Sequence, residues 1–335
     1  MRRYLIRPGA GPESLTIQDV GIPSPERGQV LVRLRAASLN FRDLLIARGQ
    51  YPGGAATSIV PLSDGAGEVV AIGAGCARLA VGDRVAGIFM QSWVGGKIVD
   101  ADLGSALGGA IDGVLAEYRL FDEAGLVRLP DHLSFEEGAT LPCAAVTAWN
   151  ALFGLRPLLP GQTVLTLGTG GVSTFAIQLA HAAGARVIAT SSDDAKLAKA
   201  RALGASETIN YRASPEWDAE VRRLTGGHGV NLVVEVGGPG TLQRSIASTA
   251  RGGVVQMIGV LSMAEIDPLP ILTGGVLVRG LMVGSREMFE AMNEAIAAHR
   301  LHPEIDRVFS FSEAMEAYSH LAAAGHVGKV VVTTA

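Results

Sequence analysis

The run Thr163-Val164-Leu165-Thr166-Leu167-Gly168-Thr169-Gly170-Gly171-Val172-Ser173 decides the fold of this 335-residue chain. Its first five residues are mainly apolar or β-branched and predict a buried parallel strand, and the glycines predict a turn whose backbone lies open to a bound molecule. Apolar residues then recur at helical spacing from Phe175 to Ala180. Because a helix N-terminus stabilises an anion, we expect a dinucleotide pyrophosphate to bind there.

The glycine pattern is incomplete, since Ser173 stands where a third glycine is usual. A glycine turn that only packs a helix on a strand therefore remains an alternative. A second strand at residues 186–190 follows at the spacing of a βαβ unit, which favours the dinucleotide. The expected contacts in the turn are Gly168, Thr169, Gly170, Gly171, Val172 and Ser173.

The end of the second strand bears on which dinucleotide binds. An acidic residue there would accept hydrogen bonds from the ribose of NAD, but this chain has Ser191. Lys196 follows, and Tyr211 comes after a third expected strand at residues 207–210. Hydroxyls with a cation suit a 2′-phosphate, so NADP is favoured over NAD. In the alternative reading Ser191 caps the next helix, with two aspartates in its first turn and Lys196 on a solvated face.

Composition narrows the class of protein. The length allows two domains, and the net charge of −4 comes from scattered charges that suggest no nucleic-acid partner. No apolar run is long enough to span a membrane, and two cysteines exclude a disulfide framework. We expect a globular cytoplasmic enzyme.

The order of elements predicts an α/β protein with two domains. Residues 1–124 read as short strands broken by glycine and proline turns, which indicates a β-rich domain; the expected strands are 4–6, 29–34, 67–72, 84–87 and 115–120. Residues 125–285 carry six strands joined by helices, as in a doubly wound parallel (Rossmann) sheet. Residues 286–335 are expected to return to the first domain.

This layout resembles the medium-chain dehydrogenase/reductase superfamily over the whole length. The resemblance rests on the runs 37–43 (ASLNFRD), 65–70 (GAGEVV), 81–85 (VGDRV), 113–118 (GVLAEY), 141–148 (LPCAAVTA), the glycine turn and 328–331 (GKVV). It implies a GroES-like catalytic domain beside the Rossmann domain. It also implies a homodimer that pairs through the last strand of the cofactor domain, here residues 276–282.

Alcohol dehydrogenases of that superfamily hold a catalytic zinc with a Cys, a His and a further Cys or His. Here Asn40 stands in the first position and Leu62-Ser63-Asp64 in the second, which leaves Cys143 as the one matching residue. Asp64 adds a second candidate at most, and a catalytic zinc needs three protein ligands. We therefore expect no zinc.

The run Asn40-Phe41-Arg42-Asp43, with Tyr51 nearby, resembles the zinc-free quinone oxidoreductases and the enoyl-reductase domains of polyketide synthases. The resemblance implies hydride transfer from NADPH to a quinone or an activated double bond. The Asn40 amide can donate to an acceptor carbonyl, and Tyr51 or water can supply a proton. Arg42, Asp43 and Asp64 complete the catalytic candidates; in the alternative, Arg42 and Asp43 form only an ion pair that holds the loop.

Further cofactor contacts are implied by the resemblance alone. They are Thr147, Gly237, Ile258, Gly259, Val260, Val283, Ser285 and Lys329, and a surface position is an equal alternative for Lys329. In the loop at residues 88–113, Met90 and Trp93 either form an apolar wall over the substrate or make ordinary loop or subunit contacts.

Two other functions stay open. One is an alcohol dehydrogenase or carbonyl reductase without zinc or with an atypical metal, and its substrate would be an alcohol or aldehyde. The other is a cofactor-binding protein without catalysis that serves a structural or regulatory role. The leading prediction is an NADPH-dependent reductase of a quinone, enone or enoyl compound.

Overall fold

The computed structural model describes residues 1–52, 55 and 57–334 and divides into two compact units. Unit 1 contains Met1–Val146 and Gly284–Ala335, and unit 2 contains Thr147–Val283. Residues 125–146 therefore belong with unit 1 in the structure, whereas the sequence pattern assigned them to the dinucleotide-binding domain.

Unit 2 is built on one parallel sheet of six strands in the order β10-β9-β8-β11-β12-β13. The strands are β8 (Thr163–Leu167), β9 (Arg186–Ser191), β10 (Glu207–Asn210), β11 (Val230–Glu235), β12 (Thr249–Met257) and β13 (Leu277–Gly280). The helices are α4 (Val146–Phe153), which starts one residue before the unit, α5 (Gly171–Ala182), α6 (Asp194–Ala202), α7 (Trp217–Leu224), α8 (Pro239–Ser248) and α9 (Leu269–Gly274). The predicted doubly wound sheet is confirmed.

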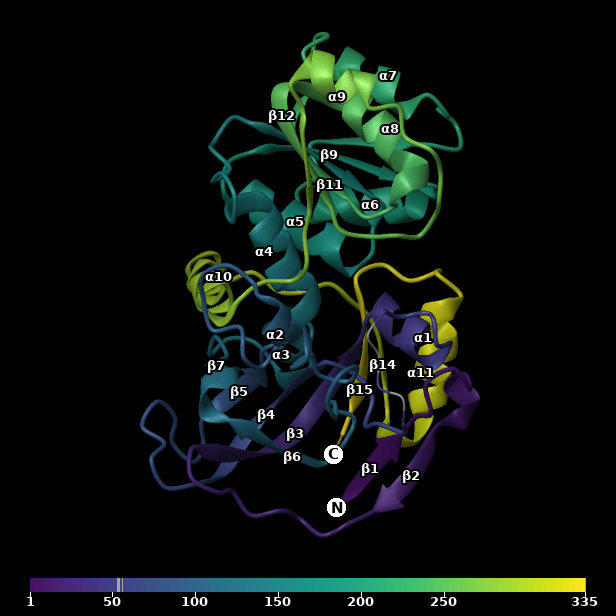
Figure 1. Cartoon of the computed structure of the whole chain (residues 1–335). Helices are drawn as coiled ribbons and strands as arrows, with labels where there is room; N and C mark the ends of the chain where they lie inside the picture. The colour runs from purple at the N-terminus through teal and green to yellow at the C-terminus, as the bar shows by residue number, and fades with distance from the viewer. Residues whose placement is uncertain (53–54, 56, 335) are drawn as a thin grey trace. The chain divides into compact units, whose positions relative to one another are not determined.

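The strand order reverses direction at β8. The chain runs outward from β8 to β10, then returns to β11 and continues to β13. Because such connections are right-handed, α5 and α6 cover one face of the sheet and α7, α8 and α9 cover the other (Figure 1). The glycine turn thus follows β8 at the switch point between β8 and β11, where doubly wound sheets bind their ligands.

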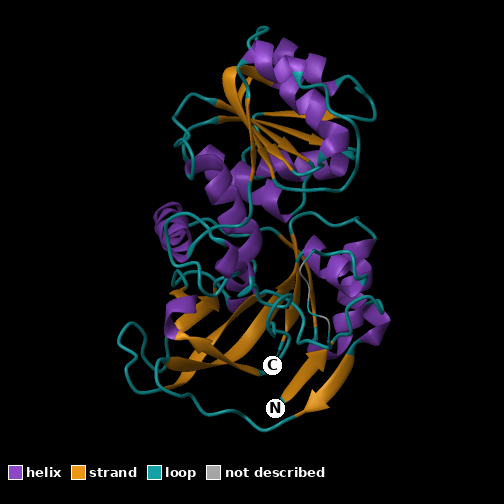
Figure 2. Cartoon of the chain, viewed as in Figure 1, coloured by secondary structure: helices purple, strands orange, loops and turns teal. Residues whose placement is uncertain are grey.

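Unit 1 contains a larger, mostly antiparallel sheet in the order β14-β15-β3-β4-β5-β7, with β6 paired to β3 (Figure 2). Its strands are β3 (Gln29–Leu39), β4 (Asp64–Ile72), β5 (Arg84–Gly87), β6 (Tyr118–Asp122), β7 (Leu126–Arg128), β14 (Ile305–Phe309) and β15 (Lys329–Thr333), and β1 (Arg2–Leu5) pairs with β2 (Thr16–Asp19). Its helices are α1 (Phe41–Ala47), α2 (Asp100–Leu103), α3 (Phe135–Ala139), α10 (Arg286–His299) and α11 (Ala314–Ala322), with a π-helical turn at Leu141–Ala145. The expected β-rich domain is confirmed.

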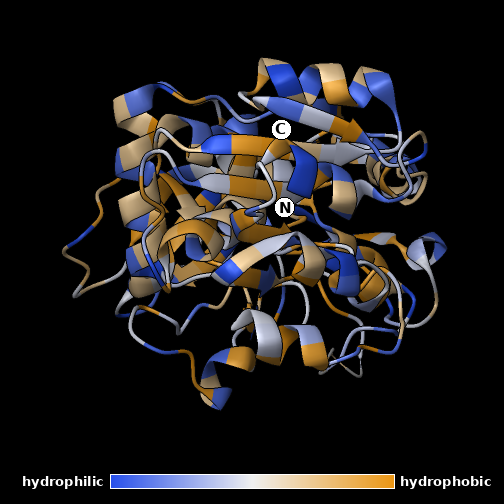
Figure 3. Ribbon diagram, turned by 90° about the horizontal axis from the view of Figure 1, so that it is seen from above, coloured by the Kyte–Doolittle hydropathy of each residue, from blue (hydrophilic) through white to orange (hydrophobic). Residues whose placement is uncertain are grey.

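Each unit buries its own apolar core. In unit 1 the core joins β3, β4 and β15 to α11, and in unit 2 it joins the sheet to its covering helices. The helices alternate polar and apolar residues along their ribbons, as one-sided packing requires (Figure 3). Among the described residues, no helix combines the length and apolar character needed to cross a membrane.

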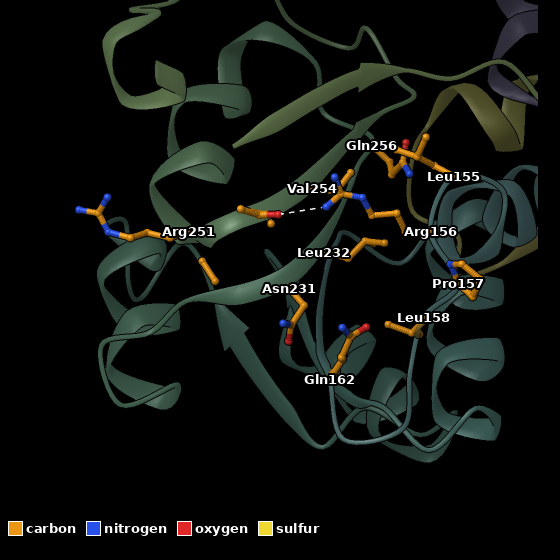
Figure 4. Close-up of a pocket in the computed structure, with 13 residues that line it drawn as sticks. Leu155, Arg156, Pro157, Leu158, Gln162, Asn231, Leu232, Arg251, Val254 and Gln256 are labelled. Carbon is orange, nitrogen blue, oxygen red and sulfur yellow. Dashed lines mark hydrogen bonds between the residues drawn. The ribbon is translucent and has the colours of Figure 1, made fainter. Parts of the chain in front are cut away.

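A cavity of about 120 Å³ lies at the amino ends of the central strands of the unit 2 sheet, whereas the glycine turn follows the carboxyl end of β8. Gln162 and Asn231, at the amino ends of β8 and β11, line it together with Arg156 and Gln256 (Figure 4). Arg156 Nη1 lies 3.5 Å from the Gly252 carbonyl oxygen across its margin. Because nucleotides bind at the carboxyl ends of parallel strands, this cavity is separate from the expected cofactor turn.

Candidate functional site

Asn40 lies where β3 ends and α1 begins, and it is the N-cap residue of that helix. Its backbone N–H donates to Asp43 Oδ2 at 2.7 Å, and the Asp43 N–H donates to the Asn40 carbonyl oxygen at 2.9 Å. This reciprocal pair satisfies two groups at the helix end and fixes the backbone of Asn40. The Asn40 side chain therefore starts from a rigid position.

Lys329 meets Asn40 from the neighbouring strand β15. Its ammonium group donates to Asn40 Oδ1 at 2.5 Å and to the Leu39 carbonyl oxygen at 2.7 Å. Lys329 is 3% exposed, which contradicts the alternative of a surface lysine. The family resemblance implied a place near the cofactor, and the structure shows that Lys329 lies in unit 1 with the catalytic candidates.

Asp64 is the second anchor of this cluster and is fully buried. Its carboxylate accepts from Ser63 Oγ at 2.6 Å and from the Cys143 backbone N–H at 3.1 Å, and Oδ2 lies 3.8 Å from Lys329 Nζ. Burial raises the pKa of Asp64, whereas Lys329 and the Ser63 hydrogen bond act to lower it. Lys329 thus bridges the Asn40 amide and a buried carboxylate.

The approach to Asp64 is strained. Leu62, two residues earlier, is buried and has φ of 69°, a left-handed conformation that is costly for a leucine. Gly108 and Gly113 pack on its backbone so closely that a side chain at either would collide with Leu62. This packing holds the turn that delivers Ser63 and Asp64.

Arg42 is buried beside the cluster, and its Nε and Nη2 atoms have no hydrogen-bond partner among the described residues. Its Nη1 donates to the Leu107 carbonyl oxygen at 2.8 Å and lies 3.6 Å from Asp43 Oδ1. Its guanidinium carbon lies 4.9 Å from the centre of the Tyr51 ring and 4.5 Å from that of Phe89. Arg42 therefore pairs with Asp43, as one sequence reading expected, and supports the Tyr51 ring by a cation–π contact.

Burial perturbs the acids of the cluster. Loss of hydration raises the pKa of Asp43 to about 6, although Arg42 acts to lower it. Burial and the negative charge of Asp64 raise the pKa of the Cys143 thiol far above its usual range. Burial and the charge of Asp43 also raise the pKa of Tyr318 on α11. Cys143 and Tyr318 are therefore protonated at neutral pH.

The glycine turn of unit 2 has the geometry of an open cradle. Gly168 has φ of 70°, and Gly170 is the N-cap of α5. A Cβ atom at either glycine would meet no atom within 4 Å, so the space above the turn is open. Ser173 is buried and donates its hydroxyl to the Leu167 carbonyl oxygen at 2.7 Å, which ties the helix to the strand. Thr169, Gly171 and Val172 complete the turn and the first residues of α5.

The region after β9 contains the residues expected to choose between NADP and NAD. Ser191 is buried at the end of β9, and its carbonyl oxygen accepts from the Tyr211 N–H at 3.0 Å. The N-cap of α6 is Asp193, which accepts from the Lys196 backbone N–H at 3.0 Å. The alternative in which Ser191 caps this helix is therefore wrong.

The segments after β11 and β12 lie side by side. The Ile258 N–H donates to the Glu235 carbonyl oxygen at 2.8 Å, and a side chain at Gly238 would meet Val260 and Gly259. The Glu235 carboxylate accepts from the Gly237 N–H at 2.7 Å and the Gly238 N–H at 3.0 Å. These amides are therefore occupied within the protein.

The other expected cofactor residues lie in different units. Thr147 is buried in α4 of unit 2. Val283 has φ of 36°, and its carbonyl oxygen accepts from Asn150 Nδ2 at 2.7 Å within the same unit. Ser285 belongs to unit 1, where its hydroxyl oxygen caps α10 by accepting from the Met288 N–H at 3.3 Å. Trp93 is buried and donates its indole N–H to the Gly96 carbonyl oxygen at 3.1 Å, as ordinary loop packing requires.

Two parts of the site were not found from the sequence. One is the contact of Lys329 with Asn40 and Asp64, which joins residues far apart in the chain. The other is Glu235, whose signal was an acidic residue at the end of an otherwise apolar strand, directly before a glycine pair.

Two family models match the chain. Residues 26–131 match the alcohol dehydrogenase GroES-like domain, and residues 171–298 match the zinc-binding dehydrogenase model.

Similar proteins extend over the whole length. A zinc-type alcohol dehydrogenase-like protein of Schizosaccharomyces pombe is 44% identical over 98% of both chains. A quinone oxidoreductase of Lama guanicoe is 28% identical over 99% of this chain and 97% of its own. The solved structure of an NAD-dependent alcohol dehydrogenase aligns over 100% of both chains with a TM-score of 0.90 and 34% identity. The chain thus belongs to the medium-chain dehydrogenase/reductase superfamily of NAD(P)-dependent oxidoreductases.

Proposed function

We propose that this protein is an NADPH-dependent reductase that sends a hydride to a quinone or to the double bond of an α,β-unsaturated carbonyl compound without catalytic zinc. The observation that carries the proposal is the Asn40 side chain. Its Oδ1 accepts from Lys329, and its buried Nδ2 donor has no close hydrogen-bond partner among the described residues, although the Asn40 side chain acts to lower the pKa of Asp64. A buried donor without a partner is costly, and a substrate oxygen would satisfy it.

The proposed role of Asn40 follows from the charge that forms in the reaction. When hydride adds to the β-carbon of an enone, negative charge grows on the carbonyl oxygen. A fixed N–H donor aimed at that oxygen lowers the barrier without reorganisation. Asn40 takes this role, with Asp43 and Lys329 fixing its backbone and side chain.

Tyr51 is the proposed proton donor. Its ring rests against the Arg42 guanidinium, which is itself fixed by Leu107 and Asp43. A phenol O–H group can deliver its proton to the reduced product. Arg42 is buried, so we assign it to the support of Tyr51.

The donors near Asp64 do not fit a zinc ion. Asp64 and Cys143 are the only candidates that the family pattern leaves, and two protein ligands are one fewer than a catalytic zinc needs. The Asp64 carboxylate also lies 3.8 Å from the Lys329 ammonium, whose positive charge would repel a dication. Within the described residues, no group of three His, Cys, Asp or Glu side chains is placed to hold a metal.

The glycine turn fits a dinucleotide. The space above Gly168 and Gly170 is open, and the first N–H groups of α5 have no partner within the helix. Bound there, NADPH would supply the hydride. Ser191 and Lys196 support NADPH over NADH because a hydroxyl and an ammonium group can both donate to a 2′-phosphate.

The test is the oxidation of NADPH by purified protein with a panel of quinones, enones, enoyl thioesters and aldehydes. The proposal predicts turnover with at least one quinone or conjugated acceptor. Turnover confined to simple aldehydes would contradict it.

A second candidate is an alcohol dehydrogenase, because one similar solved structure is that of an NAD-dependent alcohol dehydrogenase. That function predicts oxidation of an alcohol with NAD and sensitivity to chelation. The same panel run with NAD and alcohols separates the two.

We also propose a homodimer formed through β13. The strand lies at the edge of the unit 2 sheet, and Leu277 and Met282 on and after it are exposed. Sedimentation measurements would test this, and a monomer at micromolar concentration would contradict it.

A further inference from the structure

We infer that Lys329 is a positioning residue of the proposed reaction: its ammonium group holds the Asn40 side-chain amide in the one orientation that leaves Nδ2 free to donate. The inference rests on the proposed function, in which that donor polarises the acceptor.

The backbone directs Lys329 inward. β15 pairs antiparallel with β3, and the register that sets Val330 opposite Leu39 places Lys329 opposite Asn40. Gly328, just before it, has φ of 77°, and a side chain there would collide with the Glu304 carbonyl oxygen. The Lys329 N–H donates to that same oxygen at 3.0 Å. The lysine therefore enters the strand at a fixed point with its side chain buried.

The chemistry of the contact fixes the amide. An ammonium group has three donors and no acceptor, so only an oxygen can face it. Asn40 Oδ1 lies 2.5 Å from Lys329 Nζ, and a flipped amide would set the Nδ2 donor against the ammonium donors. The Asn40 side chain also acts to lower the pKa of Asp64, as a nearby amide donor does, and this contact favours the same orientation.

The ammonium group is itself held in place. The Leu39 carbonyl oxygen accepts from it at 2.7 Å, and Asp64 Oδ2 lies 3.8 Å away. Asp64 is in turn anchored by Ser63 and by the Cys143 N–H. A chain of contacts thus runs from the buried carboxylate through the lysine to the amide.

A merely structural ion pair between Lys329 and Asp64 would affect stability alone. A positioning role predicts in addition a loss of turnover at unchanged cofactor affinity. Glutamine at position 329 separates orientation from charge, because its amide can donate to Asn40 Oδ1 but carries no charge.

The test compares Lys329→Met and Lys329→Gln with the wild type, with Lys97→Met on the surface loop as the matched control. In the Met variant we expect kcat for the acceptor found in the panel to fall about 100-fold, as misplacement of a catalytic group can cost. The Kd for NADPH should change less than about twofold, and Lys329→Gln should recover about tenfold of the lost rate. Should the Met variant not fold, Lys329→Met/Asp64→Asn removes the unpaired carboxylate and is used in its place.

Three kinetic results would overturn the inference. They are a kcat in the Met variant close to that of the wild type, equal rates in the Met and Gln variants, and a loss confined to NADPH affinity. The last result would make Lys329 a cofactor contact.

A second readout does not need turnover. Protein labelled with ¹⁵N-asparagine shows a pair of side-chain amide signals for Asn40, assigned by their loss in Asn40→Asp. We expect this pair to shift or broaden in Lys329→Met and to keep its position in Lys329→Gln. An unchanged pair in the Met variant would refute the positioning role. If the wild type reduces no acceptor, the proposed function fails and this spectrum still decides the inference.

Discussion

Replacing Asn40 with aspartate isolates the donor on which the proposed chemistry depends. The two side chains have the same shape, and aspartate keeps an oxygen for the Lys329 ammonium group that now lies 2.5 Å from Oδ1. The Asp43 carboxylate bonds the backbone of residue 40 rather than its side chain, so the start of α1 is retained. The substitution removes the Nδ2 donor and adds a carboxyl group beside Lys329 and Asp64.

The magnitude follows from the use of a single buried donor. Removal of one donor to a developing oxyanion costs about 100- to 1,000-fold in kcat, or about 2.7–4 kcal/mol. We expect the loss in kcat to lie in the upper half of that range, because the new carboxylate oxygen also repels the developing negative charge. The Kd for NADPH should stay within about twofold, since the proposed interaction of Asn40 is made with the acceptor in the transition state.

The assay is NADPH oxidation under saturating cofactor and acceptor, with NADPH affinity measured separately by fluorescence. Asn231→Asp is the matched control. Its Oδ1 accepts from the Thr163 N–H at 2.8 Å, so aspartate keeps that bond at an exposed site in unit 2. A kcat in Asn40→Asp within about threefold of the control would refute the role of Asn40.

Three further changes test other parts of the account. Tyr51→Phe keeps the ring that contacts Arg42 and removes the proton donor, so kcat should fall about 100-fold or more while the NADPH Kd is unchanged; an unaffected rate would remove Tyr51 from the mechanism. Lys196→Ala should weaken NADPH about tenfold and leave NADH unchanged, with Lys199→Ala on the same helix as the control; equal losses for both nucleotides would contradict the phosphate assignment. Burial raises the pKa of Asp43 from 3.8 to about 6, so the folded protein binds its proton more tightly and stability falls as pH rises between these values. Relative to Asp43→Asn, the free energy of unfolding of the wild type in urea should fall by about 3 kcal/mol between pH 4 and 7, at 1.36 kcal/mol per pKa unit. Parallel pH profiles for the two proteins would show that titration of Asp43 does not cause the pH dependence.

The parallel sheet of unit 2 could be predicted because its signals are local. The apolar run before Gly168 and the glycine turn itself encode a strand, a turn and a helix without reference to distant residues. The observed β10 (Glu207–Asn210) has the bounds that its pattern predicted, and β9 extends one residue further to Ser191.

Strand ends in unit 1 were harder to predict. The apolar alternation predicted a strand at residues 29–34, but β3 continues to Leu39 because β4 and β15 pair with its second half. Residues 115–117 were expected in a strand, yet β6 begins at Tyr118. Pairing with distant strands decided both limits, and a local pattern does not contain that information.

The candidate site shows the same division. Asn40, Asp43 and Asp64 were predicted as candidates from motifs, and the structure brings them together with Lys329. The partnership of Lys329 with Asn40 depends on the register between β15 and β3, two strands at opposite ends of the chain. Only the folded structure reveals it.

The most direct measurement of the central claim follows the hydride itself. NADPH labelled with deuterium at the transferred position is reacted with an enone and metal-stripped protein, and the product is examined by mass spectrometry and NMR. Zinc-free hydride transfer predicts a saturated ketone with one deuterium at the β-carbon, formed at a rate that added zinc does not raise. Deuterium at the carbonyl carbon of an alcohol, or activity that appears only when zinc is restored, would contradict it.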